Sequence, residues 1–464
     1  MTDALFAVIE CLHSMKNFYD LTIIGGGLAG SEAALQAAKW GLNVQLIEMR
    51  PTVTTGAHIS NNLAELVCSN SLGSTLPDRA PGVLKQELRQ MGSYLLDFAE
   101  KTSVPAGRAL AVDRNMFSQL VTDRLSASSN IHITREEANT IPDGAVIIAT
   151  GPLTSLNFSK TISELTGEDA LHFYDAIAPI INFESINLNI AFRASRYQNV
   201  ESSGGDYINL PFTKAEYYHF VELLTAAKRI PLRSFELEVE KGVRAGAHEF
   251  FEGCLPVEIL AQRGQDSLAF GPMRPVGLTD PHTNSRPFAV IQLRQDNLVG
   301  NLYNMVGFQT NLTYGEQIRV FRNIPGLEHA EFERFGQMHR NTFISSPKLL
   351  LPTLQLRDRP NIFFAGQITG VEGYAGSIAT GLLASWNASR LINNQPPLTL
   401  PETTILGALC HYITHADLSN FQPMKANFGI LPPLHLDRKA GKLERAQLYS
   451  ERSSKDLKIF MENL

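Results

Sequence analysis

The first fifty residues alternate between apolar runs and polar breaks in the order of a strand, a turn, a helix and a second strand. An apolar run over residues 19–24 ends at a glycine-rich stretch, residues 25–30. Strong helix formers follow over 31–38, and a second apolar run, 44–47, ends in Glu48. Short apolar runs bounded by glycines indicate buried strands, and the composition of 31–38 favours a helix. This opening predicts a β-α-β unit with a parallel sheet.

The turn of this unit has the spacing of a dinucleotide-binding loop. Gly25, Gly27 and Gly30 fit G-x-G-x-x-G, which provides a tight turn, a close approach of the backbone to a pyrophosphate, and close packing of helix on strand. Glu48 lies 18 residues after Gly30, where a carboxylate can accept the hydroxyls of an adenosine ribose. The predicted cofactor-binding residues of this unit are Gly25, Gly26, Gly27, Leu28, Ala29, Gly30 and Glu48. An ordinary glycine turn with a surface glutamate is the weaker interpretation, because strand, loop, helix, strand and acid all agree.

Later segments return to the same pattern after an interruption. A polar loop over 52–82 precedes expected helices at 83–100 and 113–125 and a strand at 146–151. Between 181 and 330 the chain changes to short expected strands (188–192, 288–293 and 302–308) with one clear helix, 214–227. An apolar run then ends at Gly366 and Gln367, and a helix is expected over 377–391. A strand, Ala-Gly and a helix at the far end of the chain are typical of FAD domains, although Gln367 occupies the usual place of an acid. The pairing of these distant ends favours FAD over NAD.

We therefore predict an α/β protein with a discontinuous Rossmann-like FAD-binding domain and an inserted α+β domain. The expected FAD-binding parts are residues 1–180 and 331–464, and the expected insertion is 181–330. The second part ends in a basic tail, residues 437–458, with seven Lys or Arg against four Asp or Glu. A solvated helix face is the favoured interpretation of that tail.

Composition narrows the function classes. The 464 residues carry a net charge of −6, so any contact with nucleic acid must be a local patch. No apolar run approaches the ~20 residues of a membrane span, and residues 1–14 lack the basic start of a signal peptide. The four cysteines, at 11, 68, 254 and 410, have no metal-ligand spacing. We expect a cytoplasmic protein with free thiols, without a bound metal, a membrane contact or a protein partner.

Several longer strings carry a family resemblance that extends from about residue 19 to 435. They are 25–30, 48–51 (EMRP), 65–72 (ELVCSNSL), 250–256 (FFEGCLP), 270–278, 292–297, 338–343, 366–374 and 421–424. In this order they resemble the bacterial folate- and FAD-dependent tRNA (uracil-5-)-methyltransferases, the TrmFO family, which is related to GidA-type flavoproteins.

The resemblance implies a reaction and its participants. It implies methylation of uracil C5 at uridine 54 of the tRNA T-loop, with carbon from 5,10-methylenetetrahydrofolate and reducing equivalents from NADPH or NADH through FAD. It makes Cys254 the nucleophile at C6, and Cys68 the group that takes the C5 proton or holds the intermediate. Tyr374 either stacks a pteridine against the flavin or simply packs.

Three other functions remain open at this point. The same chemistry on a ribosomal RNA uridine differs only in its target. A flavin oxidoreductase for a small molecule would need neither RNA nor Cys254, and a flavin-bound RNA-binding protein would show no turnover.

The stretch from 263 to 322 contains arginines and no lysine, a composition that suits phosphate contact and base stacking. These arginines are Arg263, Arg274, Arg286, Arg294, Arg319 and Arg322. The resemblance implies that the insertion over 181–330 binds substrate and RNA, and in that case Arg274 and Arg294 would hold phosphates. The alternative is that these arginines pair with nearby acids such as Asp280 and Asp296.

Overall fold

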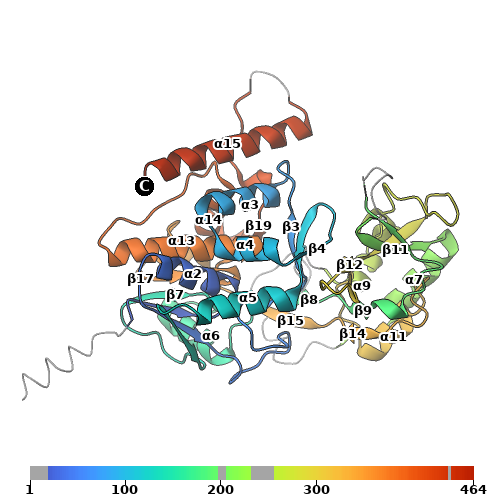
Figure 1. The fold of residues 1–464 in the computed structure, drawn as a ribbon, viewed down its shortest axis with the longest axis horizontal. Helices are drawn as coiled ribbons and strands as arrows, with labels where there is room; N and C mark the ends of the chain where they lie inside the picture. The colour runs from blue at the N-terminus through green and yellow to red at the C-terminus, as the bar shows by residue number, and fades with distance from the viewer. Residues whose placement is uncertain (1–18, 197–204, 231–254, 437–439) are drawn as a thin grey trace, which may run out of the picture.

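Two β-sheets organise the part of the chain described by the computed structural model, residues 19–196, 205–230, 255–436 and 440–464 (Figure 1). The first sheet has the order β16-β17-β7-β1-β2-β6, with parallel neighbours except for the antiparallel edge strand β16. Its strands are β1 (Leu21–Ile24), β2 (Val44–Glu48), β6 (Ile131–Arg135), β7 (Ala145–Ile148), β16 (Gln355–Leu356) and β17 (Arg359–Phe364). The α/β class predicted from the sequence is confirmed. Its parallel strands come from both ends of the chain.

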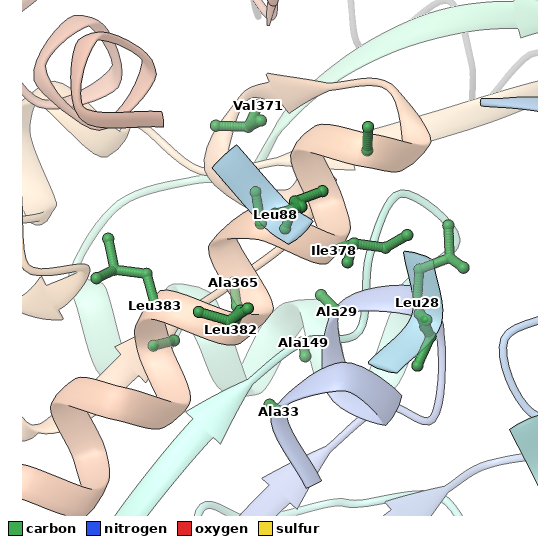
Figure 2. Close-up of a cluster of buried hydrophobic side chains, with 14 of the residues drawn as sticks. Leu28, Ala29, Ala33, Leu88, Ala149, Ala365, Val371, Ile378, Leu382 and Leu383 are labelled. Carbon is green, nitrogen blue, oxygen red and sulfur yellow. The ribbon is translucent and has the colours of Figure 1, made fainter. Parts of the chain in front are cut away.

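Small residues let two helices pack closely behind this sheet. Helix α2 (Leu28–Lys39) contacts the long helix α13 (Tyr374–Ile392). A Cβ on Gly30 would lie 1.8 Å from the carbonyl oxygen of Gly25, and one on Gly381 would lie 2.2 Å from that of Ala29. Figure 2 shows Ala29 and Ala33 of α2 near Ile378 and Leu382 of α13. Any larger side chain at these two glycines would separate the helix from its neighbour.

The second sheet is antiparallel and has its own apolar core. Its order is β10-β11-β12-β13-β9-β14. The strands are β9 (Ile180–Asn182), β10 (Phe192–Ala194), β11 (Tyr207–Phe212), β12 (Ala289–Gln295), β13 (Leu302–Met305) and β14 (Phe332–Arg334). Helices α7 (Lys214–Ala226), α9 (Val257–Gln262), α10 (Ser267–Phe270) and α11 (Tyr314–Phe321) contribute to that core. In Figure 1 this group lies to the right, and the pair β8 (Leu171–Ala176) and β15 (Met338–Phe343) lies between it and the first sheet.

The remaining elements are helices and two small separate sheets, β3-β5-β4 and β18-β19. The helices are α3 (Ala80–Met91), α4 (Tyr94–Lys101), α5 (Arg114–Ser126), α6 (Leu156–Thr166), α12 (Ser346–Leu349), α14 (Ile405–His415) and α15 (Lys442–Glu462). The short strands are β3 (Ser71–Ser74), β4 (Ser103–Val104), β5 (Ala109–Val112), β18 (Val371–Glu372) and β19 (Met424–Lys425). Buried Glu87 of α3 accepts hydrogen bonds from the backbone N–H groups of Ile405 and Leu406 and from the Ser453 hydroxyl. One carboxylate thus joins α3, the start of α14 and α15.

Two sequence expectations about secondary structure are wrong. The single helix expected over 83–100 is divided into α3 and α4, because Gly92 adopts φ +74° and the Ser93 hydroxyl caps the next helix by accepting from Leu96 N. Buried Glu32 stabilises this break by accepting hydrogen bonds from the backbone N–H groups of Tyr94 and Leu95. The strand expected over 188–192 begins only at Phe192.

A buried polar network connects the second sheet to the loop that carries Cys68. Arg294 Nε donates to Asn70 Oδ1 at 2.8 Å, and Asn70 Nδ2 donates to the Gln295 carbonyl oxygen at 2.9 Å. The next residue along, Asp296, accepts two hydrogen bonds from Arg114 at 3.1 and 3.0 Å. All four of these polar side chains are buried. Each of these side chains would be a buried, unpaired polar group if its partner were displaced. The network therefore favours one arrangement of the second sheet against the Cys68 loop.

We predict that Asp296→Ala lowers the free energy of unfolding by about 3 kcal/mol, because it leaves the buried Arg114 guanidinium without its carboxylate. Denaturant titration measures this loss. Glu316→Ala is the matched control, because the Glu316–Arg319 pair lies at the surface and should contribute less than about 1 kcal/mol. Equal losses in the two variants would contradict a supporting role for the network.

Candidate functional site

The glycine loop leaves open space in front of the N-terminus of α2. Gly25 has φ +105°, and a Cβ there would lie 2.6 Å from the Ala149 carbonyl oxygen. Gly27 differs, since a Cβ at this position would meet no atom within 4 Å. No side chain caps α2, so its first N–H groups face this space. The loop therefore forms an open cradle, which a side chain at Gly27 would fill. Phosphate binding at the start of a helix requires such open space.

Glu48 lies at the end of β2 beside this cradle. Its Oε2 accepts from Gly26 N at 2.9 Å, and its Oε1 accepts from the backbone N and Nε of Arg50 at 3.0 and 2.9 Å. Burial alone would raise the pKa of Glu48, but the charge and hydrogen bonds of Arg50 and the Gly26 N–H outweigh it and lower the pKa. The fixed carboxylate lines a pocket with Gly25, Gly27 and Thr150. It remains ionised and can accept further hydrogen bonds, as a ribose hydroxyl requires.

A second cavity, of about 300 Å³, brings together side chains from distant parts of the chain. Cys68, Gln367 and Tyr374 line it, and so do Glu372, Asn341 and Lys425. Gln367 Nε2 donates to Glu372 Oε2 at 2.6 Å. Gly366, just before it, has φ +83°, and a Cβ there would lie 2.9 Å from the Ala29 Cβ. Segments that follow β2 and β17 of the first sheet thus meet at one site.

The Tyr374 hydroxyl holds the Cys68 loop in place. It accepts hydrogen bonds from the backbone N–H groups of Cys68 at 2.9 Å and Ser69 at 3.1 Å. Burial raises the pKa of this phenol, so it stays protonated. This contact is a structural role that sequence reasoning did not assign to Tyr374.

Burial raises the pKa of two groups in the cavity. Burial and the neighbouring Asp175 carboxylate raise the pKa of the Cys68 thiol, whose Sγ donates to the Ala176 carbonyl oxygen at 3.9 Å. Burial raises the pKa of Glu372 to about 7, although the positive charge of Lys425 opposes the shift. A carboxylate that titrates near neutral pH is suited to proton transfer. Cys68 is, in this geometry, a thiol and not a thiolate.

Polar atoms with no partner also lie at this cavity. The Asn341 side chain is 1% exposed, yet neither its Oδ1 nor its Nδ2 has a hydrogen-bond partner within the described chain. His339 also lines the cavity, and its buried Nδ1 is equally without a described partner. Buried polar groups are normally paired, so these atoms indicate a ligand with both donors and acceptors. A planar heterocycle such as a flavin, a pteridine or a uracil has such an edge.

The candidate arginines within the described residues do not line this cavity. Cys254 lies outside the described residues. Arg294 is 7% exposed and bonded to Asn70, so the expectation that it holds an RNA phosphate is wrong. Arg319 pairs with Glu316, and Arg322 donates to the Ala330 carbonyl oxygen. Arg274 is exposed, and its phosphate contact stays a prediction.

Sequence reasoning named neither Glu372, Asn341, His339 nor Lys425 as site residues. Three of them lie inside strings that carried the resemblance, 338–343 and 366–374, and Lys425 follows directly after another, 421–424. Their position in or next to these strings is the one feature of the sequence that indicates a role in the site. Their convergence depends on the pairing of β18 with β19 and of β15 with β8.

The described residues contain neither a metal-binding cluster nor a membrane-spanning helix. No group of three or more His, Cys, Asp or Glu side chains in these ranges is placed to hold a metal ion. No helix in the same ranges has the length and apolar character needed to cross a membrane.

Comparison with known proteins places these features in a family. The family model described as "Glucose inhibited division protein A" matches residues 20–396. Methylenetetrahydrofolate--tRNA-(uracil-5-)-methyltransferase TrmFO of Natranaerobius thermophilus is 54% identical over 443 residues, which cover 95% of this chain and 99% of that protein. The TrmFO of Enterococcus faecalis is 52% identical over 433 residues, 93% of this chain and 96% of its own.

A solved structure agrees at the level of the fold. Aquifex aeolicus GidA in its form II crystal superposes with a TM-score of 0.64 at 15% identity, covering 96% of this chain and 75% of that one. The resemblance inferred from the sequence strings is therefore confirmed, and the chain belongs to the GidA-related TrmFO family of methylenetetrahydrofolate--tRNA-(uracil-5-)-methyltransferases.

Proposed function

We propose that this protein methylates C5 of uridine 54 in the tRNA T-loop, with 5,10-methylenetetrahydrofolate as carbon donor. FAD would be the bound cofactor, NADPH or NADH the reductant, and the cytoplasm the location. The observation that carries the proposal is the cavity that joins Cys68, Glu372 and the unpartnered Asn341 amide next to Tyr374, in a chain of the TrmFO family.

The residues of the glycine loop and its neighbours fit FAD. The open cradle at Gly27 would take the pyrophosphate, and the ionised Glu48 would accept the ribose hydroxyls. Gly366 and Gln367 at the start of the second element would lie beside the ribityl chain. Bound FAD supplies the hydride that turns a methylene group into a methyl group.

The chain's own groups would handle the uracil. The Cys254 thiolate adds to C6, and the electrons of the C5–C6 double bond move to O4, so that C5 can attack the one-carbon unit. A base would then take the C5 proton while the bond between the transferred carbon and the folate nitrogen breaks, which releases tetrahydrofolate and leaves a methylene group on C5. Addition of a hydride, which bound FAD would supply, would give the methyl group, and the C6–sulfur bond would then break to release the Cys254 thiolate. Because Cys68 is protonated in this geometry and Glu372 titrates near pH 7, we assign the proton acceptance to Glu372. Cys68 would hold the intermediate.

The direct test is transfer of labelled carbon from methylenetetrahydrofolate to unmodified tRNA. The same assay on ribosomal RNA separates the alternative target. A flavin oxidoreductase for small molecules would turn over without RNA, and a binding protein would transfer no label to either RNA.

Gly27→Val should give a folded protein that contains no FAD. The Gly27 backbone has φ −75°, which any residue adopts, and the new side chain enters the empty cradle without meeting protein atoms at its Cβ. Flavin absorbance and chromatography of the released cofactor, which distinguishes FAD from FMN, measure the loss. Gly315→Val is the matched control, since a Cβ there also meets nothing. Full FAD content in Gly27→Val would reject the cradle.

Cys254→Ala should bind FAD and still oxidise NADPH, because the reduction of the flavin needs no nucleophile at C6. It should transfer no carbon to tRNA. RNA containing 5-fluorouridine should become covalently attached to the wild-type protein and not to this variant, as gel electrophoresis under denaturing conditions would show. Normal methylation by Cys254→Ala would exclude the assigned role.

Glu372→Gln should lower kcat for methyl transfer by about 100-fold and remove the rise of activity through pH 7. The reason is that a proton acceptor works only when ionised, above its pKa of about 7. NADPH oxidation should persist. If the activity of the variant still rises with pH near pH 7, the proton acceptor is another group and not Glu372.

The same substitution predicts a change in stability with a definite sign. A pKa raised from 4.5 to about 7 gives the wild-type protein a contribution that is fully present below pH 4.5 and lost as the pH rises through 7. Glu372→Gln lacks this titration. Its melting temperature should therefore rise relative to wild type between pH 5 and pH 8, and a constant difference would contradict the raised pKa.

A further inference from the structure

A second groove adjoins the cavity that contains Cys68 and Tyr374. It has a volume of about 590 Å³ and lies between the start of α3, the segment after β19 and the first turns of α15. Pro81 and Ala426 line both spaces. A ligand that leaves the cavity past these two residues therefore enters the groove.

The groove carries more positive than negative charge. Its cations are Arg79, Lys442 and Arg445, and its single acid is Asp78. Arg79 pairs with Asp78 at 3.1 Å but keeps half of its side chain exposed. Lys442 and Arg445 are exposed, and neither lies within 4.0 Å of a carboxylate in the described part of the chain. Two cations on successive positions of one helix face repel each other, and a bound anion would relieve this repulsion.

An aromatic pair gives the groove a firm wall. The rings of Phe428 and Tyr449 stack with centroids 5.5 Å apart at 15°. Arg452 lies over the Tyr449 ring at 5.1 Å and donates to the carbonyl oxygens of Pro432 and Pro433. These contacts hold α15 against the segment before it. The groove is thus preformed, and an apolar stem can lie along its wall while charges face Lys442 and Arg445.

We propose that this groove binds the chain of γ-linked glutamates at the end of the folate donor, an inference that rests on the proposed function. The donor's reactive heterocycle belongs in the cavity with Cys68, and its glutamate end is a short polyanion joined to it covalently. Continuity through Pro81 and Ala426 and the excess of positive charge fit such a tail. RNA fits less well, since a nucleic-acid site that makes about six to ten phosphate contacts needs more cations than the three in this groove.

Steady-state kinetics with two donors test the proposal: methylenetetrahydrofolate with one glutamate and with five. For the wild-type protein, KM for the pentaglutamate donor should be about tenfold lower, a difference of about 1.4 kcal/mol in binding. Lys442→Ala combined with Arg445→Ala should bring the two KM values together. KM for the monoglutamate donor, KM for tRNA and kcat should stay unchanged. Lys455→Ala, an exposed lysine of the same helix outside the groove, should keep the tenfold ratio.

Three results with an active wild-type protein overturn the proposal, and the first is an equal KM for the two donors. A ratio that survives the double substitution excludes the groove as the tail site. A rise in KM for tRNA with both donors would show that the groove binds RNA. If the wild-type protein turns over neither donor, the proposed function fails, and equilibrium binding of the two folates still tests the groove. Tighter binding of the pentaglutamate that depends on Lys442 and Arg445 supports it, and equal affinities reject it.

Discussion

The buried network of Asn70, Arg294, Asp296 and Arg114 is the contact on which the geometry of the site depends. It joins the end of β12 in the second sheet to the loop that carries Cys68, and its polar side chains are buried. Asn70 Nδ2 also donates to the carbonyl oxygen of Val112 in β5, so the same amide connects the Cys68 loop to both β5 and β12. Since removal of any of these side chains leaves a buried polar group without its partner, the two sheets have one favoured arrangement.

Close packing of backbone on backbone is the second requirement. Gly30 and Gly381 let α2 approach both the first strand and α13, and this brings the Gly366 turn against Ala29. The glycine cradle and the Gly366–Gln367 turn therefore lie on the same side of the sheet, although more than three hundred residues separate them in the sequence. The proposed FAD would span both, with its pyrophosphate in the open space at Gly27.

The cavity contains acidic side chains, and the groove outside it is basic. Inside, Asp175 and Glu372 accompany a neutral thiol, and burial raises the pKa of both Cys68 and Glu372. Lys425 stands at the cavity, and beyond Pro81 and Ala426 the groove is basic. A donor with a neutral heterocycle and an anionic tail matches this order, because the low-dielectric cavity disfavours charge while the exposed groove attracts it.

The sequence by itself determined the β-α-β opening, the α/β class, the family and the positions of the glycines, because local periodicity and residue spacing encode them directly. The tertiary structure decided matters that depend on contacts between distant residues. Arg294 reads as an RNA-binding arginine in the sequence, and only the fold places it beside Asn70 in the interior. Likewise, Glu372 titrates near neutral pH only because folding removes it from water next to Asp175 and Lys425, and no pattern within the chain records that burial.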